Sequence, residues 1–218
     1  MHLTKVLFIP FTAALMMACK HEIPQNPGPE VCFETDVLPI FQSNCAKSGC
    51  HDAITRADGY RLDTYNHIIA KGVRPGDPSD SEIYEVLLED GNDRMPPPPN
   101  QPLTGSQIKL IYDWIKQGAR NTTGCAPTCD SSQFTYSGQI KPIMETHCLG
   151  CHTGSTDAGG FIDLSTYQGV KEQADLESLL GTINHTTGYS PMPKNSAKLS
   201  DCKIALIRKW IQAGAPNN

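Results

Sequence analysis

The chain has 218 residues, and 18 Lys and Arg against 23 Asp and Glu give it a formal net charge of −5 at pH 7. This mild acidity comes without any basic cluster, which argues against nucleic acid as a partner. The length allows one large domain or two domains of about 100 residues each.

Residues 1–18 have the pattern of an export signal. Lys5 precedes an apolar run over residues 6–17, which is too short to span a bilayer. The stretch LMMAC resembles a bacterial lipoprotein box, in which Cys19 becomes the lipidated first residue; an ordinary secretory signal cut nearby is the alternative. We expect an exported protein in the periplasm or outer envelope, attached to a membrane only through Cys19, with a Pro-rich tether over residues 19–30.

A repeat begins after the tether. Residues 37–45 (VLPIFQSNC) align with residues 140–148 (IKPIMETHC), and both predict a short helix that ends at a cysteine. The motif LDTY of the first copy returns as LSTY in the second. The repeat predicts two related domains, over residues 31–125 and 126–218.

Each copy of the repeat is expected to end in a helix. Apolar residues recur with spacings of three and four around Trp114 and again around Trp210, the pattern of a helix with one buried face. A glycine follows each of these segments where the helix would stop. Thr104 and Gln107 form a capping box at the start of the first one. These residues are expected to form the packing core of each copy.

The second copy carries the motif CLGCH, in which Cys148 and Cys151 lie three positions apart and His152 follows directly. This spacing is typical of c-type haem attachment, where two cysteines form thioethers to the vinyl groups of the macrocycle and the adjacent histidine reaches the iron. A zinc site would want a second close pair of ligands, and a disulfide would make His152 incidental.

The first copy has a wider form of this motif, with four residues between Cys45 and Cys50 and with His51 directly after. Because His51 directly follows Cys50, the cysteine that forms one thioether is next to the histidine that binds the iron, as in the second copy. The longer loop can still bring Cys45 to the other vinyl group. The alternatives are a Cys45–Cys50 disulfide without haem, or attachment through Cys50 alone. Because the site follows a proline by six residues, as the second site does, we expect haem here too.

The sixth iron ligand should lie well downstream, because the chain must pass around the edge of the ring. Met95 and Met192 each precede a proline just before the last helix of their copy, and a proline stiffens such a loop. Met144 falls in the first helix of the second copy and is expected in the core. Met95 and Met192 are therefore the predicted distal ligands, and His/Met ligation raises the reduction potential relative to two histidines.

Three histidines are rivals for the distal position. His67 lies on a predicted helix and has no counterpart in the second copy. His147 directly precedes Cys148 and cannot easily reach the far face of the ring. His185, near Met192, is the most plausible rival, although the first copy has no histidine there.

Four cysteines remain after Cys19 and the haem motifs, namely Cys32, Cys125, Cys129 and Cys202. An even remainder in an exported protein indicates two disulfides, with three possible pairings. Since Cys32 and Cys125 bracket the first copy, we predict Cys32–Cys125 and Cys129–Cys202. A linker over residues 121–128 would then hold the two copies close together.

With the two cysteine–histidine motifs, the Met-Pro loops and the final WIxxGA helices, each copy resembles class I cytochrome c domains. The sequence of residues 31–218 is similar to those of cytochrome c domains in exported Bacteroidetes and Planctomycetes proteins. The similarity is most specific in the second copy. The resemblance implies an all-α fold with a few helices around each covalent haem c, and electron transfer as the role.

The sequence as a whole therefore predicts a non-enzymatic dihaem carrier that passes single electrons between redox partner proteins. One rival is a dihaem peroxidase-like enzyme, which needs one iron with an open or displaceable distal position. The other is a haem-free exported module held by disulfides, and perhaps by zinc.

Overall fold

The computed structural model describes residues 29–125, 130–154, 159–194 and 196–218. Within these ranges the chain forms helices and helical turns, and it contains no strand. The all-α class expected from the sequence is confirmed. No helix in the described part of the chain is long and apolar enough to cross a membrane. The predicted signal (1–18), Cys19 and most of the tether (19–30) lie outside the described residues, as does part of the linker (121–128).

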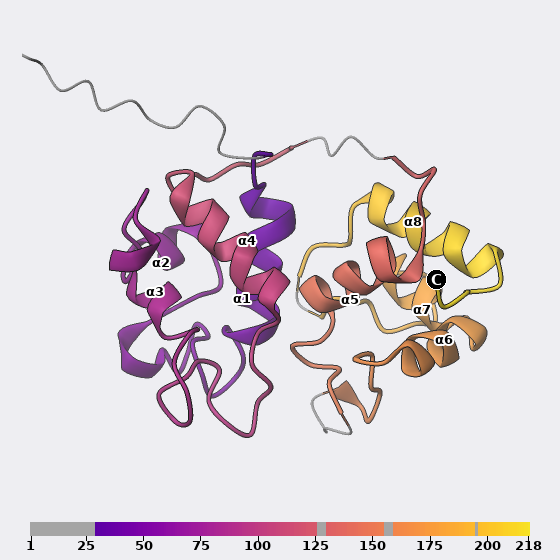
Figure 1. Cartoon of the computed structure of the whole chain (residues 1–218). Helices are drawn as coiled ribbons and strands as arrows, with labels where there is room; N and C mark the ends of the chain where they lie inside the picture. The colour runs from indigo at the N-terminus through magenta and orange to yellow at the C-terminus, as the bar shows by residue number, and fades with distance from the viewer. Residues whose placement is uncertain (1–28, 126–129, 155–158, 195) are drawn as a thin grey trace, which may run out of the picture.

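The helices fall into two groups, one for each copy of the repeat (Figure 1). The elements of the first half are η1 (Phe33–Val37), α1 (Leu38–Asn44), η2 (Ala57–Gly59), α2 (Tyr65–Ile69), η3 (Pro78–Asp80), α3 (Glu82–Glu85) and α4 (Gly105–Lys116). The second half contains η4 (Tyr136–Ile140), α5 (Lys141–His147), α6 (Tyr167–Asp175), α7 (Ser178–Ile183) and α8 (Asp201–Gln212). The short helices predicted before each cysteine motif, α1 and α5, are confirmed.

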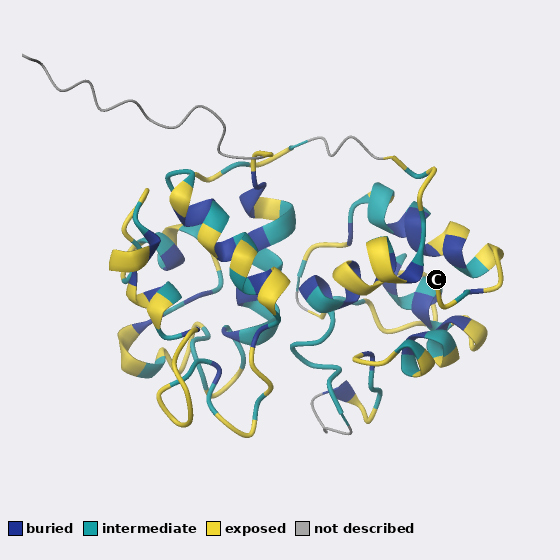
Figure 2. Cartoon of the chain, in the orientation of Figure 1, coloured by how far each residue is buried: buried dark blue, intermediate teal, exposed yellow. Residues whose placement is uncertain are grey.

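Each half has a hydrophobic core of its own, with buried residues on the inner faces of its helices (Figure 2). In the first core, the Phe33 ring centroid lies 5.2 Å from Trp114 and 5.1 Å from Tyr65. The second core repeats this trio, with the Tyr136 centroid 5.7 Å from Trp210 and 5.1 Å from Tyr167. Aromatic rings at these separations attract one another beyond the area they bury.

The tyrosine of the LDTY and LSTY motifs fastens the end of the last helix. The Tyr65 hydroxyl donates to the Ala119 carbonyl oxygen at 3.0 Å, and the Tyr167 hydroxyl donates to Ala215 at 2.8 Å. These bonds satisfy a carbonyl just beyond α4 and α8, where the helix leaves its last acceptors without partners. The sequence match between the two motifs therefore corresponds to one repeated tertiary contact.

The limits of the last helix agree with the sequence signals. Thr104 and Gln107 form the predicted capping box at the start of α4, whereas Ser200 caps α8 through its side chain alone. Gly118 (φ 96°) and Gly214 (φ 91°) follow the two helices in the left-handed region, where glycine carries no Cβ penalty. The predicted helices around Trp114 and Trp210 are confirmed.

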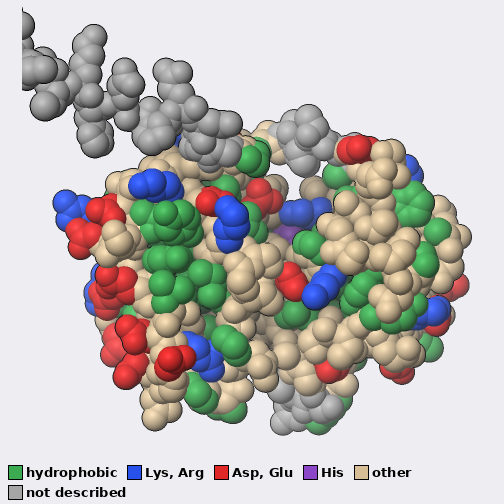
Figure 3. Space-filling view, in the orientation of Figure 1, with side chains coloured by type: hydrophobic (Ala, Val, Ile, Leu, Met, Phe, Trp, Pro, Cys, Tyr) green, Lys and Arg blue, Asp and Glu red, His purple; other side chains and the backbone are tan. Residues whose placement is uncertain are grey.

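The two halves pack against each other through α1 and α4 on one side and α5 on the other. Gln107 Nε2 donates to the Glu145 carbonyl at 2.7 Å, and Ser106 Oγ donates to the Glu145 carboxylate at 2.8 Å. From α8, Lys203 Nζ donates to the Thr35 carbonyl at 2.8 Å. On the face shown in Figure 3 the halves meet along a seam, and acidic side chains gather at the outer edge of the first half.

The predicted disulfide Cys32–Cys125 is present and closes the first half. Cys202 is also disulfide-bonded, but Cys129 lies outside the described residues, so the pairing Cys129–Cys202 stays a prediction. Among the described residues, the cysteines outside disulfides are those of the two haem-type motifs: Cys45, Cys50, Cys148 and Cys151.

Candidate cofactor site

The first half contains a hollow that is open to solvent, with an empty volume of about 870 Å³ that includes its open mouth. Its wall brings together Cys45, Cys50, His51 and Met95, four of the predicted site residues. The rest of the wall is largely apolar, with Phe41, Tyr60, Leu62, Ile83 and Leu87 among its members. Residues from three separate stretches of the chain, 41–62, 82–87 and 95–100, thus meet around one cavity.

The second half contains a similar open hollow, with an empty volume of about 980 Å³ on the same measure. Cys148, Cys151, His152 and Met192 all line it. The wall also includes Ile162, Leu164, Leu179, Ile183 and Leu199, which lie in positions remote in sequence from the cysteine motif. Both hollows therefore combine two motif thiols, the motif histidine and one methionine thioether with a largely apolar lining.

Backbone hydrogen bonds hold the two motif histidines in matching positions. Leu62 N–H donates to the His51 carbonyl at 3.0 Å, and Leu164 N–H donates to the His152 carbonyl at 2.8 Å. The leucine of each LDTY or LSTY motif therefore fixes the backbone of the histidine. This is a second role for these motifs, besides the tyrosine contact with the last helix.

The ring of His51 has a defined tautomer. Its Nδ1 lies 3.2 Å from the Ala57 carbonyl oxygen, which can only accept, so Nδ1 carries the proton. The Nε2 lone pair is then available to a metal, and a carbonyl partner of this kind orients a histidine ligand. The ring also lies nearly perpendicular to that of Tyr60, with centroids 6.1 Å apart.

The two methionines lie on loops that are fastened in the same way. Met95 N–H donates to the Val86 carbonyl at 2.8 Å, and Met192 N–H donates to the Thr182 carbonyl at 3.1 Å. In both halves the acceptor belongs to the helical segment that covers the pocket. The loops therefore present the methionines at equivalent places.

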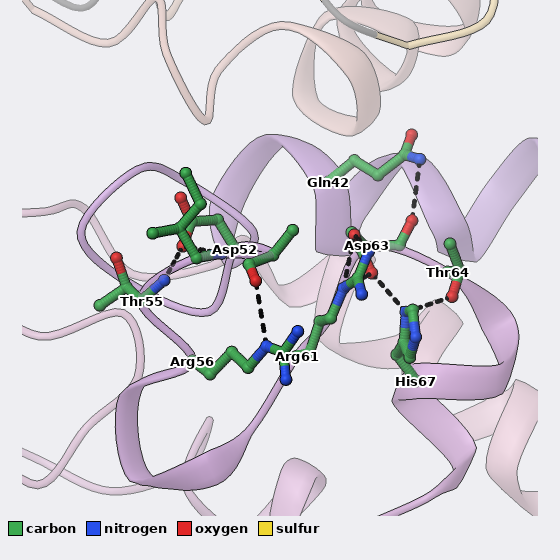
Figure 4. Close-up of polar contacts among 10 residues, drawn as sticks. Gln42, Asp52, Thr55, Arg56, Arg61, Asp63, Thr64 and His67 are labelled. Atoms are coloured by element: carbon green, nitrogen blue, oxygen red, sulfur yellow. Dashed lines mark hydrogen bonds and ion pairs between the residues drawn. The ribbon is translucent and has the colours of Figure 1, made fainter.

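The rival histidines have other contacts. His185 is exposed and its Nε2 donates to the Met192 carbonyl at 3.1 Å, so it supports the Met192 loop from outside the wall of the hollow. His67 Nδ1 lies 2.7 Å from Asp63 Oδ1 and 2.6 Å from Thr64 Oγ1, in the polar network shown in Figure 4. Met144 is buried in the second core, as expected.

His147 does line the second hollow, beside the cysteine motif. Burial lowers the pKa of His147 to about 3, so its ring is neutral. Burial also raises the pKa of the Cys45 and Cys148 thiols to about 12, which keeps them protonated. These three groups are therefore uncharged at neutral pH, although Lys47 also lines the first hollow.

Orphaned polar atoms test whether the residues present fit a haem. In the described part of the chain, three buried side-chain nitrogens have no hydrogen-bond partner: Arg94 Nη1, His147 Nε2 and His152 Nδ1. Two belong to residues of the second hollow, and Arg94 precedes Met95 and donates from Nη2 to Asn100, a residue of the first hollow. Buried polar groups normally have partners, so a ligand that carries hydrogen-bonding groups fits beside Arg94 and His147, whereas His152 Nδ1 would face away from a metal bound at Nε2.

The described residues do not form the set of ligands that the zinc alternative requires. Structural zinc takes four Cys, His or acidic ligands. Among the residues that the structure describes, no three side chains of these types are placed to hold a metal ion. What both hollows share instead is a pair of motif cysteines, the histidine that follows them and a methionine, the residue types that could hold a covalent haem.

Sequence reasoning missed the contribution of the first half to the second hollow. Gln42 and Ser43 of α1 belong to its wall, and Ser196 links back to Gln42 through a 2.9 Å hydrogen bond. Nothing in the local pattern around Gln42 indicates a contact with a site about a hundred residues further on, because that contact depends on how the halves pack.

Comparison with known families supports the class of protein that the site suggests. Residues 48–99 match the family described as Planctomycete cytochrome C. The match contains Cys50, His51 and Met95 and supports a cytochrome c-like domain, a family in which haem c is covalently bound and electron transfer is the role. It falls in the first half, whereas the resemblance carried by the sequence motifs is most specific in the second. No curated protein and no solved structure matches the chain significantly.

Proposed function

We propose that the chain is a dihaem c-type cytochrome, composed of two tandem cytochrome c-like domains, that carries single electrons between redox partner proteins of the bacterial cell envelope. The observation that carries this proposal is the repeated composition of the two hollows. Each has two thiols, a histidine directly after the second thiol, and a methionine from a distant loop.

Different residues of each half bind the edge of the haem and its iron. Cys45 and Cys50 bind the first group and Cys148 and Cys151 the second, each thiol adding its sulfur and hydrogen across one vinyl double bond so that nothing is released. His51 and His152 are the proximal ligands. Met95 and Met192 are the distal ligands, and their loops hold the weak thioether in place.

The bound iron supplies a one-electron couple, and the protein sets its potential through ligand choice, burial and orientation. The largely apolar walls would limit the contact of each group with water. With both coordination positions filled by side chains, neither iron offers a site to a substrate. This favours a carrier over the peroxidase-like alternative.

Intact-mass spectrometry tests the proposal on protein made with haem-maturation machinery. The purified chain should exceed its haem-free mass by two haems, and its reduced form should neither bind carbon monoxide readily nor turn over peroxide. A gain of one haem would contradict the dihaem assignment, and no gain would favour the haem-free module. Rapid peroxide turnover would instead favour the enzyme.

A further inference from the structure

Helix α1 is a wall shared by the two hollows. Phe41, Asn44 and the following Cys45 face the first hollow, whereas Gln42 and Ser43 face the second. An α-helix turns by about 100° per residue, so neighbouring residues reach opposite sides of a body only about 10 Å wide. The cofactor sites therefore lie back to back across a single helix.

The closest approach across this wall joins α1 to the second cysteine motif. Cys151 Sγ lies 4.0 Å from the carbonyl oxygen of Ser43. Gly150, the residue before it, packs so tightly on α1 that an added Cβ would overlap the Ser43 carbonyl carbon and oxygen. A glycine at position 150 is thus required by the packing of the two halves, and its φ is not in the left-handed region.

Polar contacts on both sides keep α1 in this position. The Gln42 amide nitrogen donates to the Asp63 carbonyl at 3.2 Å, as Figure 4 shows, and its amide oxygen accepts from Ser196 Oγ at 2.9 Å. Lys203 donates to the Thr35 carbonyl and lies 3.6 Å from the Asp36 carboxylate. The contact between Ser43 and Cys151 is therefore part of a fixed interface between the halves.

We propose that this contact is the route by which an electron passes between the two haems, an inference that rests on the dihaem function proposed above. The route runs from the Cys45 thioether along Asn44 to Ser43, crosses the 4.0 Å gap to Cys151 Sγ, and ends at the second thioether. In the step one ferrous iron is oxidised to ferric and the other ferric iron is reduced to ferrous. No proton moves and no other reactant is needed.

The test compares Gly150→Ala with Gly105→Ala. An alanine at 150 must push the second motif away from α1, whereas a Cβ at 105 meets no atom within 4 Å. After one haem is reduced by a radiolysis pulse, Gly150→Ala should equilibrate with the other haem several-fold more slowly than the wild type, and Gly105→Ala should not. Dipolar broadening between the ferric irons in the EPR spectrum should weaken in the same variant.

Intact mass is recorded for every variant, so that loss of a haem is not mistaken for a slower route. A Gly150→Ala protein with two haems and an unchanged rate would overturn the inference and leave the dihaem function intact. If Gly150→Ala does not retain both haems, the double variant Ser196→Ala/Lys203→Met loosens the same interface without altering a motif. An unchanged rate in that variant would equally overturn the route.

Discussion

At the level of single residues, the halves differ in the side chain directly before the first motif cysteine, which is Asn44 in one and His147 in the other. Both line their hollows. His147 is buried and neutral, and its Nε2 finds no partner among the described residues. The second site thus contains a titratable group that the first lacks.

This difference predicts an effect of pH on stability. The pKa of His147 falls from 6.5 to about 3 on folding, so below pH 6.5 the unfolded chain binds a proton that the folded chain does not. Stability is therefore lost as the pH falls from about 6.5 towards 3. In His147→Asn, which copies the first half, the free energy of unfolding should fall less between pH 7 and pH 5 than in the wild type.

Denaturant unfolding of the haem-loaded proteins at the two pH values measures this effect. The wild type and the variant are compared at each pH, so that other titrating groups cancel. Equal losses in both proteins would contradict a neutral, buried His147.

The proposed distal ligands, Met95 and Met192, give a second prediction. Met95→Ala or Met192→Ala opens one iron, so the reduced variant should bind one carbon monoxide per chain and the potential of that haem should fall, because methionine ligation raises it. Visible spectra with and without carbon monoxide measure the binding. Met144→Leu, a conserved-volume change in the core, is the control and should cost less than about 1.5 kcal/mol of stability.

For the second site this experiment also shows whether Met192 or His185 is the distal ligand. Because His185 supports the Met192 loop from outside, its replacement by alanine should leave the iron closed to carbon monoxide. Carbon monoxide binding in His185→Ala together with none in Met192→Ala would assign the distal position to His185 instead.

At the level of elements, the longer helices could be predicted from the sequence, whereas the shortest helical turns could not. The spacing around Trp114 and Trp210 predicted α4 and α8 because a buried face leaves a periodic pattern. The π-helical turns η1 and η4 were missed, although they directly precede α1 and α5 in both halves. In each, an N–H bonds to a carbonyl five residues back, as Leu38 does with Phe33, and five residues are too few to show a period.

The two helix caps predict a difference in stability. Thr104 takes part in a reciprocal capping box, whereas Ser200 makes one side-chain bond to Lys203 N–H. Loss of a cap costs about 1 kcal/mol, within a range of roughly 0.5–2. Thr104→Ala should therefore lower the free energy of unfolding at least as much as Ser200→Ala, measured in urea. A neutral Thr104→Ala would show that the box contributes nothing to α4.

At the level of the whole molecule, the sequence predicted which residues gather in each half but not how the halves meet. Repeated motifs identified both sets of pocket residues, since each motif carries its own chemistry. The interface depends on Gly150 fitting against Ser43 and on single polar contacts such as that of Gln107 with Glu145. Gly150 lies inside the CLGCH motif and Gln107 belongs to the capping box of α4, but neither pattern indicates a contact between the halves, so only the folded structure reveals it.

The disulfide of the first half acts on the whole of that half. Cys32 and Cys125 are 93 residues apart in sequence, and a cross-link over so long a loop restricts the unfolded chain strongly. Cys32→Ser/Cys125→Ser should lower the free energy of unfolding by roughly 2–5 kcal/mol. Denaturation of the variant and of the wild type, with and without reductant, measures this. A variant as stable as the oxidised wild type would contradict a stabilising role.

The central claim is that one chain holds two covalent haems, one in each half. Peptide mapping of the mature protein by mass spectrometry tests it most directly, because it locates each haem on a cysteine motif. We predict one haem-bearing peptide that contains Cys45 and Cys50 and another that contains Cys148 and Cys151. Recovery of either peptide without haem, or with its two cysteines joined as a disulfide, would contradict the account.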